Sequence, residues 1–351
     1  MKLAQWTLHF YRLPYRRPVT WAYAAESSSD YALLKLVADN GAVGIAEGVI
    51  KATRTGYSPR SLAATLEDVL LPLLRDVDLG DSAAVAKAFQ WLDGNLAGRA
   101  LIDNACWALR GLKGGGTEVP VTWIVTRRPP AEMAAEAADM VRRYGLRSLK
   151  LKGGQGRDTD LKVIAEVRKA VGDGIELSMD ANRAYPPEGI ADYVRAIADA
   201  GVAVAEDPCA VAPDSAFERL QRECRIPLLV DFACVSRLDA DLFLDRGARA
   251  LMIKPGRIGL TEALEIDARC AARGVAVSLG MFYESALGTA LSLQAAAALK
   301  SRRILPAEHS FFLLLTDQVA PGEVKDGRYR LPEEPDLSRL VDWKAVEKYR
   351  I

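Results

Sequence analysis

Six charged residues recur along the middle of the chain, each at the end of a short apolar run that is followed by a helical pattern. They are Lys152, Asp180, Glu206, Asp231, Lys254 and Glu284. Successive members lie roughly 25 residues apart, which is the length of one strand, one helix and two connections. A lone charge at the end of a buried strand is costly to desolvate, so six at the same place in a repeating unit indicate one shared site.

Three of these residues are carboxylates that end consecutive predicted strands. The side chains of Asp180, Glu206 and Asp231 should therefore converge on one small region. Neighbouring anions repel each other strongly in a low dielectric, and a hard divalent cation with oxygen ligands relieves that repulsion. We predict that the three carboxylates bind Mg²⁺, which keeps coordination positions open for water or a substrate oxygen. In the alternative interpretation, each carboxylate caps the next helix or pairs with an arginine.

Three lysines share the same region. Lys150 and Lys152 are two residues apart in one predicted strand, so both side chains point to the same face. Adjacent ammonium groups lower each other's pKa, and a lysine with a lowered pKa is a usable base near neutral pH. Lys254 ends a strand four strands further on, so in an eight-stranded barrel Lys152 and Lys254 would face a substrate from opposite sides. Lysines that merely neutralise the carboxylates would follow the same pattern.

The elements that must position these residues predict an α/β fold, namely a modified TIM barrel of the (β/α)7β type over residues 118–316. We expect its first strand at 119–125 and its last at 304–309. Residues 317–351 carry a hairpin signal around Asp326-Gly327, and we expect this tail to return to the N-terminal region.

Residues 1–117 predict a separate α+β capping domain, because strand patterns are followed by helical patterns without alternation. We expect a strand at 3–11 and a hairpin around Asn40-Gly41. Residues 18–30 are polar, small and aromatic, and predict a mobile loop. Residues 48–58 form a second irregular stretch.

The composition of the 351 residues excludes several functional classes. Acidic and basic residues balance at 46 each, so nothing indicates a nucleic acid or an anionic membrane as a partner. The five cysteines form no CxxC pair, which is typical of reduced thiols in a cytoplasmic protein. No apolar run approaches the length of a membrane span. We expect a cytoplasmic enzyme that acts on a small carboxylate molecule and forms a homo-oligomer.

Six short segments together form a specific pattern: Lys-x-Lys at 150–152, Asp-x-Asn at 180–182, Glu-x-Pro at 206–208, Asp231 after Ile-Pro, the run from Ile253 to Gly259, and Glu284-Ser285. This pattern resembles the enolase superfamily and, within it, the muconate lactonizing enzyme subgroup of mandelate racemase/muconate lactonizing enzyme-like proteins. The resemblance covers most of the chain. It implies Mg²⁺ on the three carboxylates, with Asn182 supporting them, and an enolate made by removing a proton α to a carboxylate. It also implies Lys152 and Lys254 as an acid/base pair and Lys150 as a helper.

One position departs from the family pattern. The Asp at the end of the fifth strand is usually followed by Glu, which pairs with the sixth-strand lysine, whereas this chain has Phe232. We therefore expect Lys254 to lack that acidic partner and to have a lower pKa than in relatives that keep the acid.

The pattern predicts a Mg²⁺-dependent racemase or epimerase that acts on an N-acylamino acid, a dipeptide or another amine-bearing acid. A cycloisomerase, an o-succinylbenzoate synthase or a dehydratase on the same scaffold is the first alternative, and a non-catalytic binding protein that retains the metal site is a remote one. Specificity in such a barrel depends on loops and strand ends. The predicted substrate-binding residues there are Trp21, Tyr23, Tyr57, Phe232, Phe282, Tyr283 and Glu284. Such an aromatic set would suit an apolar or quaternary-ammonium group.

Overall fold

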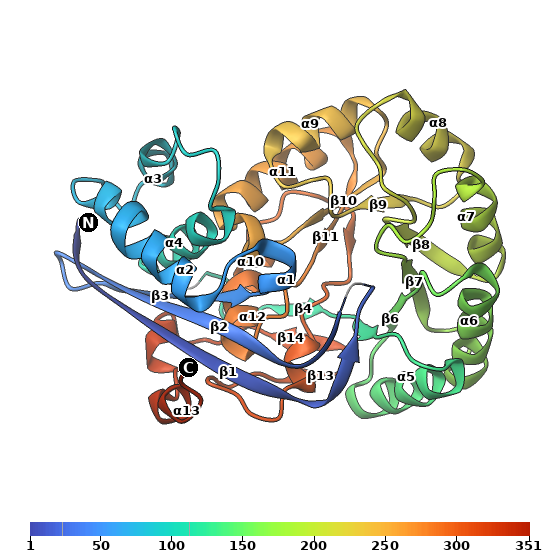
Figure 1. Ribbon diagram of the computed structural model, residues 1–351, viewed down its shortest axis with the longest axis horizontal. Helices are drawn as coiled ribbons and strands as arrows, with labels where there is room; N and C mark the ends of the chain where they lie inside the picture. Colours follow the sequence, from blue (N-terminus) through green and yellow to red (C-terminus); the bar gives the residue numbers. More distant parts are fainter. Residues whose placement is uncertain (23, 112) are drawn as a thin grey trace.

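A three-stranded antiparallel sheet lies across one side of a curled parallel sheet in the computed structural model, which describes residues 1–22, 24–111 and 113–351 (Figure 1). The antiparallel sheet is made by β1 (Leu3–Thr20), β2 (Ala25–Ala38) and β3 (Val43–Ile50) in that order. The hairpin expected around Asn40-Gly41 is confirmed, since β2 and β3 are joined there.

The prediction of a mobile loop over residues 18–30 is wrong. β1 continues to Thr20 and β2 begins at Ala25, with Val19 paired opposite Glu26. The ion pair between Arg12 Nε and Asp30 Oδ1, at 2.6 Å, joins the two strands further along. A shift of register between Pro14 and Val19 interrupts the alternation of the strand, so the sequence pattern here does not indicate a strand.

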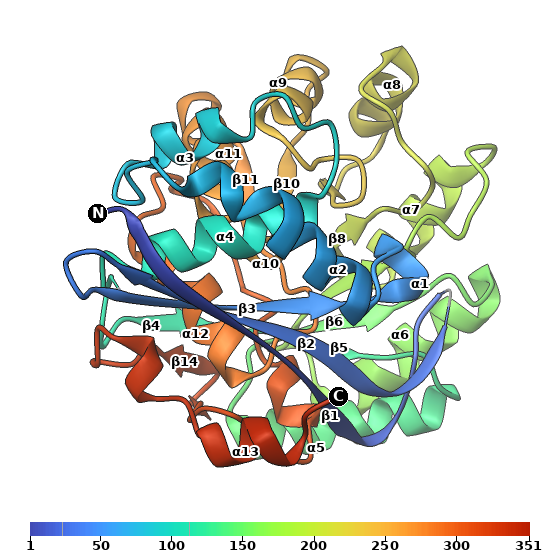
Figure 2. The same cartoon turned by 60° about the vertical axis from the view of Figure 1, so that its left-hand side comes forward.

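Short helices cover the sheet on the side that faces the barrel mouth (Figure 2). They are α1 (Ala52–Thr55), α2 (Pro59–Thr65), the π-turn η1 (Leu66–Leu70), η2 (Pro72–Leu74), α3 (Ser82–Ala88) and α4 (Leu96–Ala108). Helix α4 crosses β3 at Gly44, where a Cβ atom would lie 2.2 Å from the carbonyl oxygen of Ala105. Glycine is therefore required for this close approach.

Eight parallel strands form the barrel wall, in the unbroken order of the sequence. They are β5 (Trp123–Val125), β6 (Ser148–Lys152), β7 (Glu176–Asp180), β8 (Val202–Glu206), β9 (Leu228–Val230), β10 (Ala250–Ile253), β11 (Ala276–Leu279) and β12 (Ile304–Leu305). A parallel bridge between Val121 and Ala307 links the two ends of the sheet. The predicted (β/α)7β architecture is confirmed.

Helices follow the strands on the outside of the wall, as Figure 1 shows for α5 to α8. They are α5 (Pro130–Tyr144), α6 (Arg157–Val171), α7 (Ile190–Asp199), α8 (Ser215–Glu223), α9 (Arg237–Asp245), α10 (Pro255–Ile258), α11 (Leu260–Arg273), α12 (Ala286–Leu293) and η3 (Gln294–Ala297). Among the helices that the structure describes, none has the length and apolar character needed to cross a membrane.

The expected first and last barrel strands are each shorter than predicted. Residues 118–120 form β4, which leaves the barrel to pair with the tail, and only β5 continues the wall. At the other end β12 stops before Pro306, which has no N–H for the ladder.

The tail runs through η4 (Phe311–Leu314), β13 (Val324–Lys325), β14 (Arg328–Arg330), η5 (Leu337–Arg339) and α13 (Trp343–Lys348). β13 and β14 form the hairpin expected around Asp326-Gly327. The end of the chain returns to β1, where Ile351 N donates to Phe10 O at 3.1 Å. The tail therefore joins the capping sheet as predicted, while the domain boundaries at 117 and 316 stay predictions.

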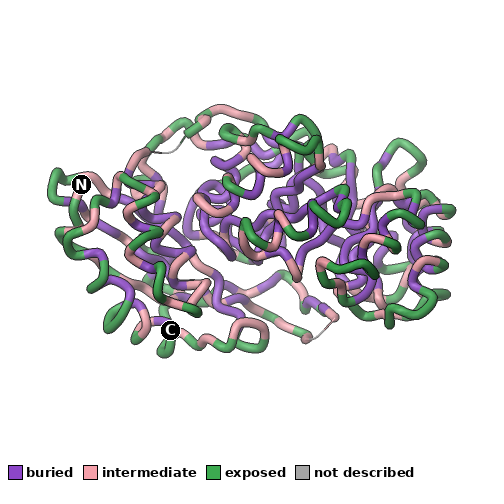
Figure 3. Tube along the Cα trace, turned by 90° about the horizontal axis from the view of Figure 1, so that it is seen from above, coloured by how far each residue is buried: buried purple, intermediate pink, exposed green. Residues whose placement is uncertain are grey.

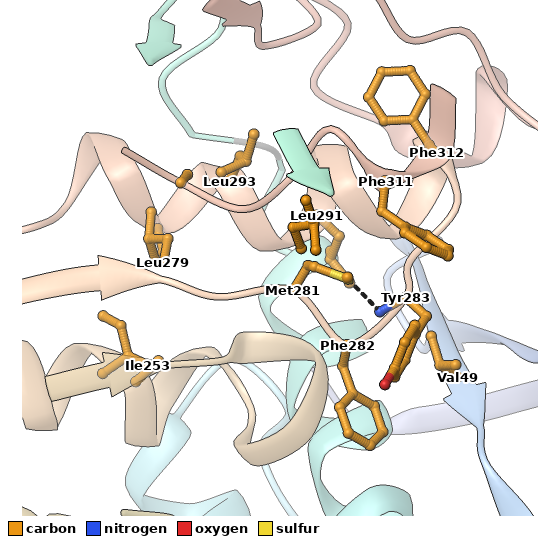
Figure 4. Close-up of a cluster of buried hydrophobic side chains, with 14 of the residues drawn as sticks. Val49, Ile253, Leu279, Met281, Phe282, Tyr283, Leu291, Leu293, Phe311 and Phe312 are labelled. Carbon is orange, nitrogen blue, oxygen red and sulfur yellow. Dashed lines mark hydrogen bonds between the residues drawn. The ribbon is translucent and has the colours of Figure 1, made fainter. Parts of the chain in front are cut away.

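Two apolar layers hold the site in place. Within the barrel, Val204, Leu229, Ala250, Met252 and Ala276 form a small buried cluster. A much larger core lies between the strands and the outer helices, and buried segments run through the centre of the molecule in Figure 3. Figure 4 shows part of this core around the end of β11, where Tyr283 lies beside Val49 of β3. Apolar packing thus fixes the loop after β11 against the capping sheet.

Candidate active site

The strand register places the predicted carboxylates and lysines together. Lys152, Asp180 and Glu206 are direct neighbours across β6, β7 and β8. Glu206 is also the partner of Leu229 in β9, and Asp231 lies two residues beyond Leu229, so its side chain points to the same face. All four side chains are buried. The carboxyl ends of four neighbouring strands therefore meet at one charged centre.

Lys150 bridges three carboxylates in this centre. Its Nζ atom lies 3.0 Å from Asp180 Oδ2 and 2.7 Å from Glu206 Oε2, and it donates to Glu308 as well. Burial alone would lower the pKa of Lys150, but Asp180, Glu206 and Glu308 raise it well above its usual value. The expectation that Lys150 and Lys152 lower each other's pKa is therefore wrong for Lys150. The environment of Lys150 therefore favours its protonated, positively charged form.

Lys152 has a different environment. It donates to Asp180 Oδ2 at 2.5 Å and to Asn182 Oδ1 at 3.5 Å. Burial, opposed by Asp180 and aided by the charge of Lys150, lowers the pKa of Lys152 below its usual value. Asn182 also donates through Nδ2 to Asp180 Oδ2 at 3.0 Å, so it supports this carboxylate as predicted from the motif. Lys152 is thus the lysine of the pair whose surroundings favour loss of a proton.

The loop after Lys152 is held by a buried carboxylate that we did not single out from the sequence. Asp160 accepts from the backbone N–H of Gly154 at 2.8 Å and from that of Gln155 at 3.2 Å. It also accepts from the hydroxyls of Tyr185 at 2.5 Å and Tyr193 at 2.8 Å. The end of β6 is therefore fixed by a network of buried hydrogen bonds.

Lys254 lies on the other side of the centre, after β10, and donates to Asp231 Oδ2 at 2.6 Å. Arg257 and Arg54 also lie near Asp231, at 3.2 and 3.9 Å between charged atoms. Although burial alone would raise it, these three cations hold the pKa of Asp231 well below its usual value. Lys254 lacks the glutamate of the family pattern, but it is not without an acidic partner, because Asp231 takes that role.

The three predicted metal ligands are paired with ammonium groups in this structure. Across the described residues, no three His, Cys, Asp or Glu side chains are gathered closely enough to hold a cation as they stand. The donor set nevertheless fits Mg²⁺ in kind, since all three ligands are buried carboxylates at neighbouring strand ends. Burial and the nearby charge of Asp180 raise the pKa of Glu206 well above its usual value, which reflects anionic repulsion that a divalent cation would relieve.

A cavity of about 880 Å³ adjoins this centre, between the capping helices and the loops after β7, β9, β10 and β11. Tyr57, Phe232 and Phe282 line it, and their role in substrate binding stays a prediction. Arg54 lies over both phenyl rings, 4.2 Å from the centroid of Phe232 and 5.1 Å from that of Phe282. Arg183 lies 3.9 Å from the centroid of Phe232. The guanidinium groups of two of the protein's own arginines therefore already lie over these rings, and the expected apolar or quaternary-ammonium substrate group stays a prediction.

Trp21 and Tyr283 lie on the Lys152 side of the centre and do not line this cavity. Their rings are 4.8 Å apart, and Lys152 Nζ is 5.5 Å from the Trp21 ring. Lys51 Nζ lies 4.3 Å from the Tyr283 ring and donates to Glu26 Oε2 at 2.6 Å. The two aromatic residues therefore form a wall beside Lys152. Tyr23 lies outside the described residues.

Glu284 is buried in the loop after β11, and burial is the main cause that raises its pKa to about 8. It accepts from the backbone N–H of Phe282 at 2.5 Å. The next residue, Ser285, donates from its backbone N–H to Glu47 of β3 at 2.8 Å and from its hydroxyl to the same carboxylate. Glu47 also accepts from Tyr11 at 2.5 Å. Hydrogen bonds to Glu47 therefore hold the loop that carries Glu284 against the capping sheet.

Two acidic residues of the centre escaped the sequence interpretation. Glu308 forms an ion pair with Lys150. It follows the last strand, so the pattern of one charged residue near a strand end could have identified it from the sequence. Asp207 accepts from the backbone N–H of Asp231 at 3.2 Å and of Phe232 at 2.9 Å. Burial and the charge of Asp231 raise the pKa of Asp207 to about 7. No signal in the sequence separates Asp207 from an ordinary loop residue.

Comparison with known families matches nearly the whole chain. Residues 132–345 match the family described as enolase C-terminal domain-like, and residues 7–122 match the mandelate racemase/muconate lactonizing enzyme N-terminal domain. The chain belongs to the mandelate racemase/muconate lactonizing enzyme family of the enolase superfamily. It is therefore an enzyme of the isomerase or lyase type found in that superfamily.

Individual members of the family resemble the chain along its full length. The o-succinylbenzoate synthase of Geobacillus kaustophilus is 29% identical over 97% of this chain and 94% of its own length. The N-succinyl-L-Arg/Lys racemase of Bacillus cereus is 26% identical, over 100% of this chain and 98% of its own.

Solved structures agree with this relationship. A muconate lactonizing enzyme from Mucobacterium Smegmatis, complexed with muconolactone, superposes with a TM-score of 0.92 at 25% identity, over 100% of both chains. A dipeptide epimerase from Enterococcus faecalis, complexed with Mg and the dipeptide L-Leu-L-Tyr, has a TM-score of 0.86 at 23% identity, over 96% of this chain and 99% of its own. These solved structures share the fold of this chain.

Proposed function

We propose that the chain is a Mg²⁺-dependent racemase or epimerase that removes the proton α to the carboxylate of a small acid through an enediolate intermediate. The observation that carries this proposal is the placement of Lys152 and Lys254. They end β6 and β10, which are four strands apart in a barrel of eight, so they approach the centre from opposite sides. An N-acylamino acid, a dipeptide or another amine-bearing acid is the substrate class.

The residues divide the chemistry between them. Mg²⁺ held by Asp180, Glu206 and Asp231 would bind the substrate carboxylate and stabilise negative charge there. Lys152, whose pKa is lowered, removes the α-proton on its side. Lys254, held by Asp231, returns a proton on the other side. Lys150 keeps its positive charge beside the developing enediolate and stabilises it.

A cycloisomerase or a β-elimination lyase is the second candidate function. It is supported by the similarity to an o-succinylbenzoate synthase and to a muconate lactonizing enzyme, which share the scaffold. In those reactions one lysine suffices for the proton transfer, and the other stabilises charge.

Incubation in D₂O with a panel of N-acylamino acids, dipeptides and other amine-bearing acids tests the chemistry. We expect the α-proton signal in the NMR spectrum of at least one acid to disappear with Mg²⁺ present, and to persist after chelation. Exchange reports formation of the enediolate whatever the final product. If no acid in the panel exchanges in the presence of Mg²⁺, proton abstraction next to a carboxylate is contradicted.

A further inference from the structure

A small cavity inside the barrel adjoins the charged centre from the side of the strand starts. Its volume is about 30 Å³, and it shares no lining residue with the 880 Å³ cavity at the strand ends. Lys150, Glu206 and Glu308 of the charged centre line it. Four hydroxyl residues also line it, namely Thr122, Ser148, Ser178 and Ser278. The cavity is therefore polar, and it contacts the ion pairs of Lys150 from below the strand ends.

The residues at the inward positions explain why this space is not filled. Ser148 and Ser178 lie two residues before Lys150 and Asp180, so their side chains point to the same inner face of the barrel. Bulky branched side chains usually fill the inside of such a barrel. Serine is much smaller, and it adds a polar group that those side chains do not have. The inner face of β6 and β7 is therefore polar, whereas β8 to β11 contribute the apolar cluster of the barrel interior.

Two of the hydroxyl groups are buried and have no hydrogen-bond partner among the described residues. They are Thr122 Oγ1 and Ser148 Oγ, whose residues are only 5% and 6% exposed. A buried hydroxyl without a partner is costly, and buried polar groups normally bond to the protein or to ordered water. The carboxylate of Glu308 accepts from Lys150 and from the backbone N–H of Met281 at 3.1 Å. Since an ionised carboxylate has about four acceptor sites, Glu308 can accept further hydrogen bonds.

A polar cavity of this size has room for water, which needs about 10–15 Å³ and two to four polar partners. We propose that the cavity is a water-binding site, in which ordered water bonds to the hydroxyls of Thr122 and Ser148 and donates to the carboxylate of Glu308. The charged centre is then hydrated from the side opposite the substrate. Glu176, the exposed first residue of β7, also lines the cavity, so water enters from the edge of the barrel where the strands begin. This inference names no substrate and does not depend on the proposed function.

Thr122→Val distinguishes a hydrated cavity from a dry one, because it replaces the hydroxyl with a methyl group of nearly the same size. In a dry cavity the change removes an unpartnered buried hydroxyl and stabilises the protein, whereas in a hydrated cavity it breaks a hydrogen bond to water. Thr289→Val is the matched control, since the hydroxyl of Thr289 is also buried without a partner among the described residues but does not line this cavity. In scanning calorimetry, we expect Thr122→Val to melt about 1–3 °C below both the wild type and Thr289→Val. A melting temperature of Thr122→Val equal to or above that of the control would refute the water site.

A high-resolution crystal structure of the wild-type protein observes the site directly, even if a variant does not fold. We expect electron density for water at hydrogen-bond distance, about 2.5–3.0 Å, from both Thr122 Oγ1 and Ser148 Oγ. Ser148→Val should lose this density, because its larger apolar side chain fills the space and removes one partner. An absence of density in the wild type would contradict the proposal. Density about 2.1 Å from these oxygens would also contradict it, because that distance is typical of Mg²⁺ and not of water.

Discussion

Removing the positive charge of Lys150 should change both the stability of the protein and the affinity of the charged centre for Mg²⁺. Lys150→Met keeps the apolar part of the side chain and removes the ammonium group, which lies 3.0 Å from Asp180 Oδ2, 2.7 Å from Glu206 Oε2 and in contact with Glu308. All four residues are buried. Breaking a buried ion network by removing one partner costs about 3–5 kcal/mol, because the opposing charges stay buried without compensation.

This loss of stability can be measured as a decrease in the melting temperature. At about 2 °C per kcal/mol for a chain of this size, metal-free Lys150→Met should melt about 6–10 °C below the wild type. The ammonium group opposes a cation at the same carboxylates, so the variant should bind Mg²⁺ more tightly than the wild type does. Mg²⁺ at a concentration of about 100 times its Kd would raise the free energy of unfolding by about 2.7 kcal/mol.

Scanning calorimetry in EDTA and in a series of MgCl₂ concentrations measures both effects. Lys169→Met is the matched control, because Lys169 is exposed on α6 and has no ion pair among the residues described, and it should behave as the wild type. An unchanged melting temperature of Lys150→Met in EDTA would refute the account of the ion network. If Mg²⁺ raises the melting temperature of the variant by less than it raises that of the wild type, the claim that the same carboxylates hold the metal is refuted.

Three further changes test neighbouring parts of the structure. Asp231→Asn should weaken Mg²⁺ binding at least about 10-fold in titration calorimetry, because one anionic ligand is lost, and unchanged affinity would place that ligand elsewhere. Asp160→Asn should lower the free energy of unfolding in urea by about 2–4 kcal/mol, against about 1 kcal/mol for Tyr193→Phe, and equal losses would contradict the four-donor network. Glu47→Gln should speed hydrogen exchange at Ser285, since one of the carboxylate's acceptors becomes a donor, and unaltered exchange would show that the capping sheet does not hold this loop.

The barrel and its charged centre could be predicted because their signals are local and periodic. Six of the eight strands end in, or are followed by, one charged residue after an apolar run, and because the strands are parallel these ends all lie at the same edge of the sheet. The faces of Lys150 and Lys152 follow from a period of two within one strand. These features need no knowledge of distant contacts.

The features that could not be predicted depend on contacts between distant residues. The long β1–β2 hairpin is stabilised by pairing across a shift of register, which hides the strand pattern in residues 18–30. The raised pKa of Lys150 comes partly from Glu308, 158 residues away. Phe232 stands in place of the expected partner of Lys254, but Asp231 accepts a hydrogen bond from this lysine. The Phe232 ring instead lies against Arg54 of α1 and Arg183 of the loop after β7.

Solvent exchange in the two alanine variants of the opposed lysines tests the central claim most directly. The two enantiomers of a substrate acid are incubated separately in D₂O with Lys152→Ala, Lys254→Ala and wild-type enzyme, and the α-proton is followed by NMR. If each lysine serves one face, each variant should exchange the α-proton of one enantiomer only, with opposite preference, and neither should interconvert the pair, whereas the wild type exchanges both. Loss of exchange for both enantiomers in one variant, with slow turnover retained in the other, would contradict two-base racemisation and favour the cycloisomerase or lyase.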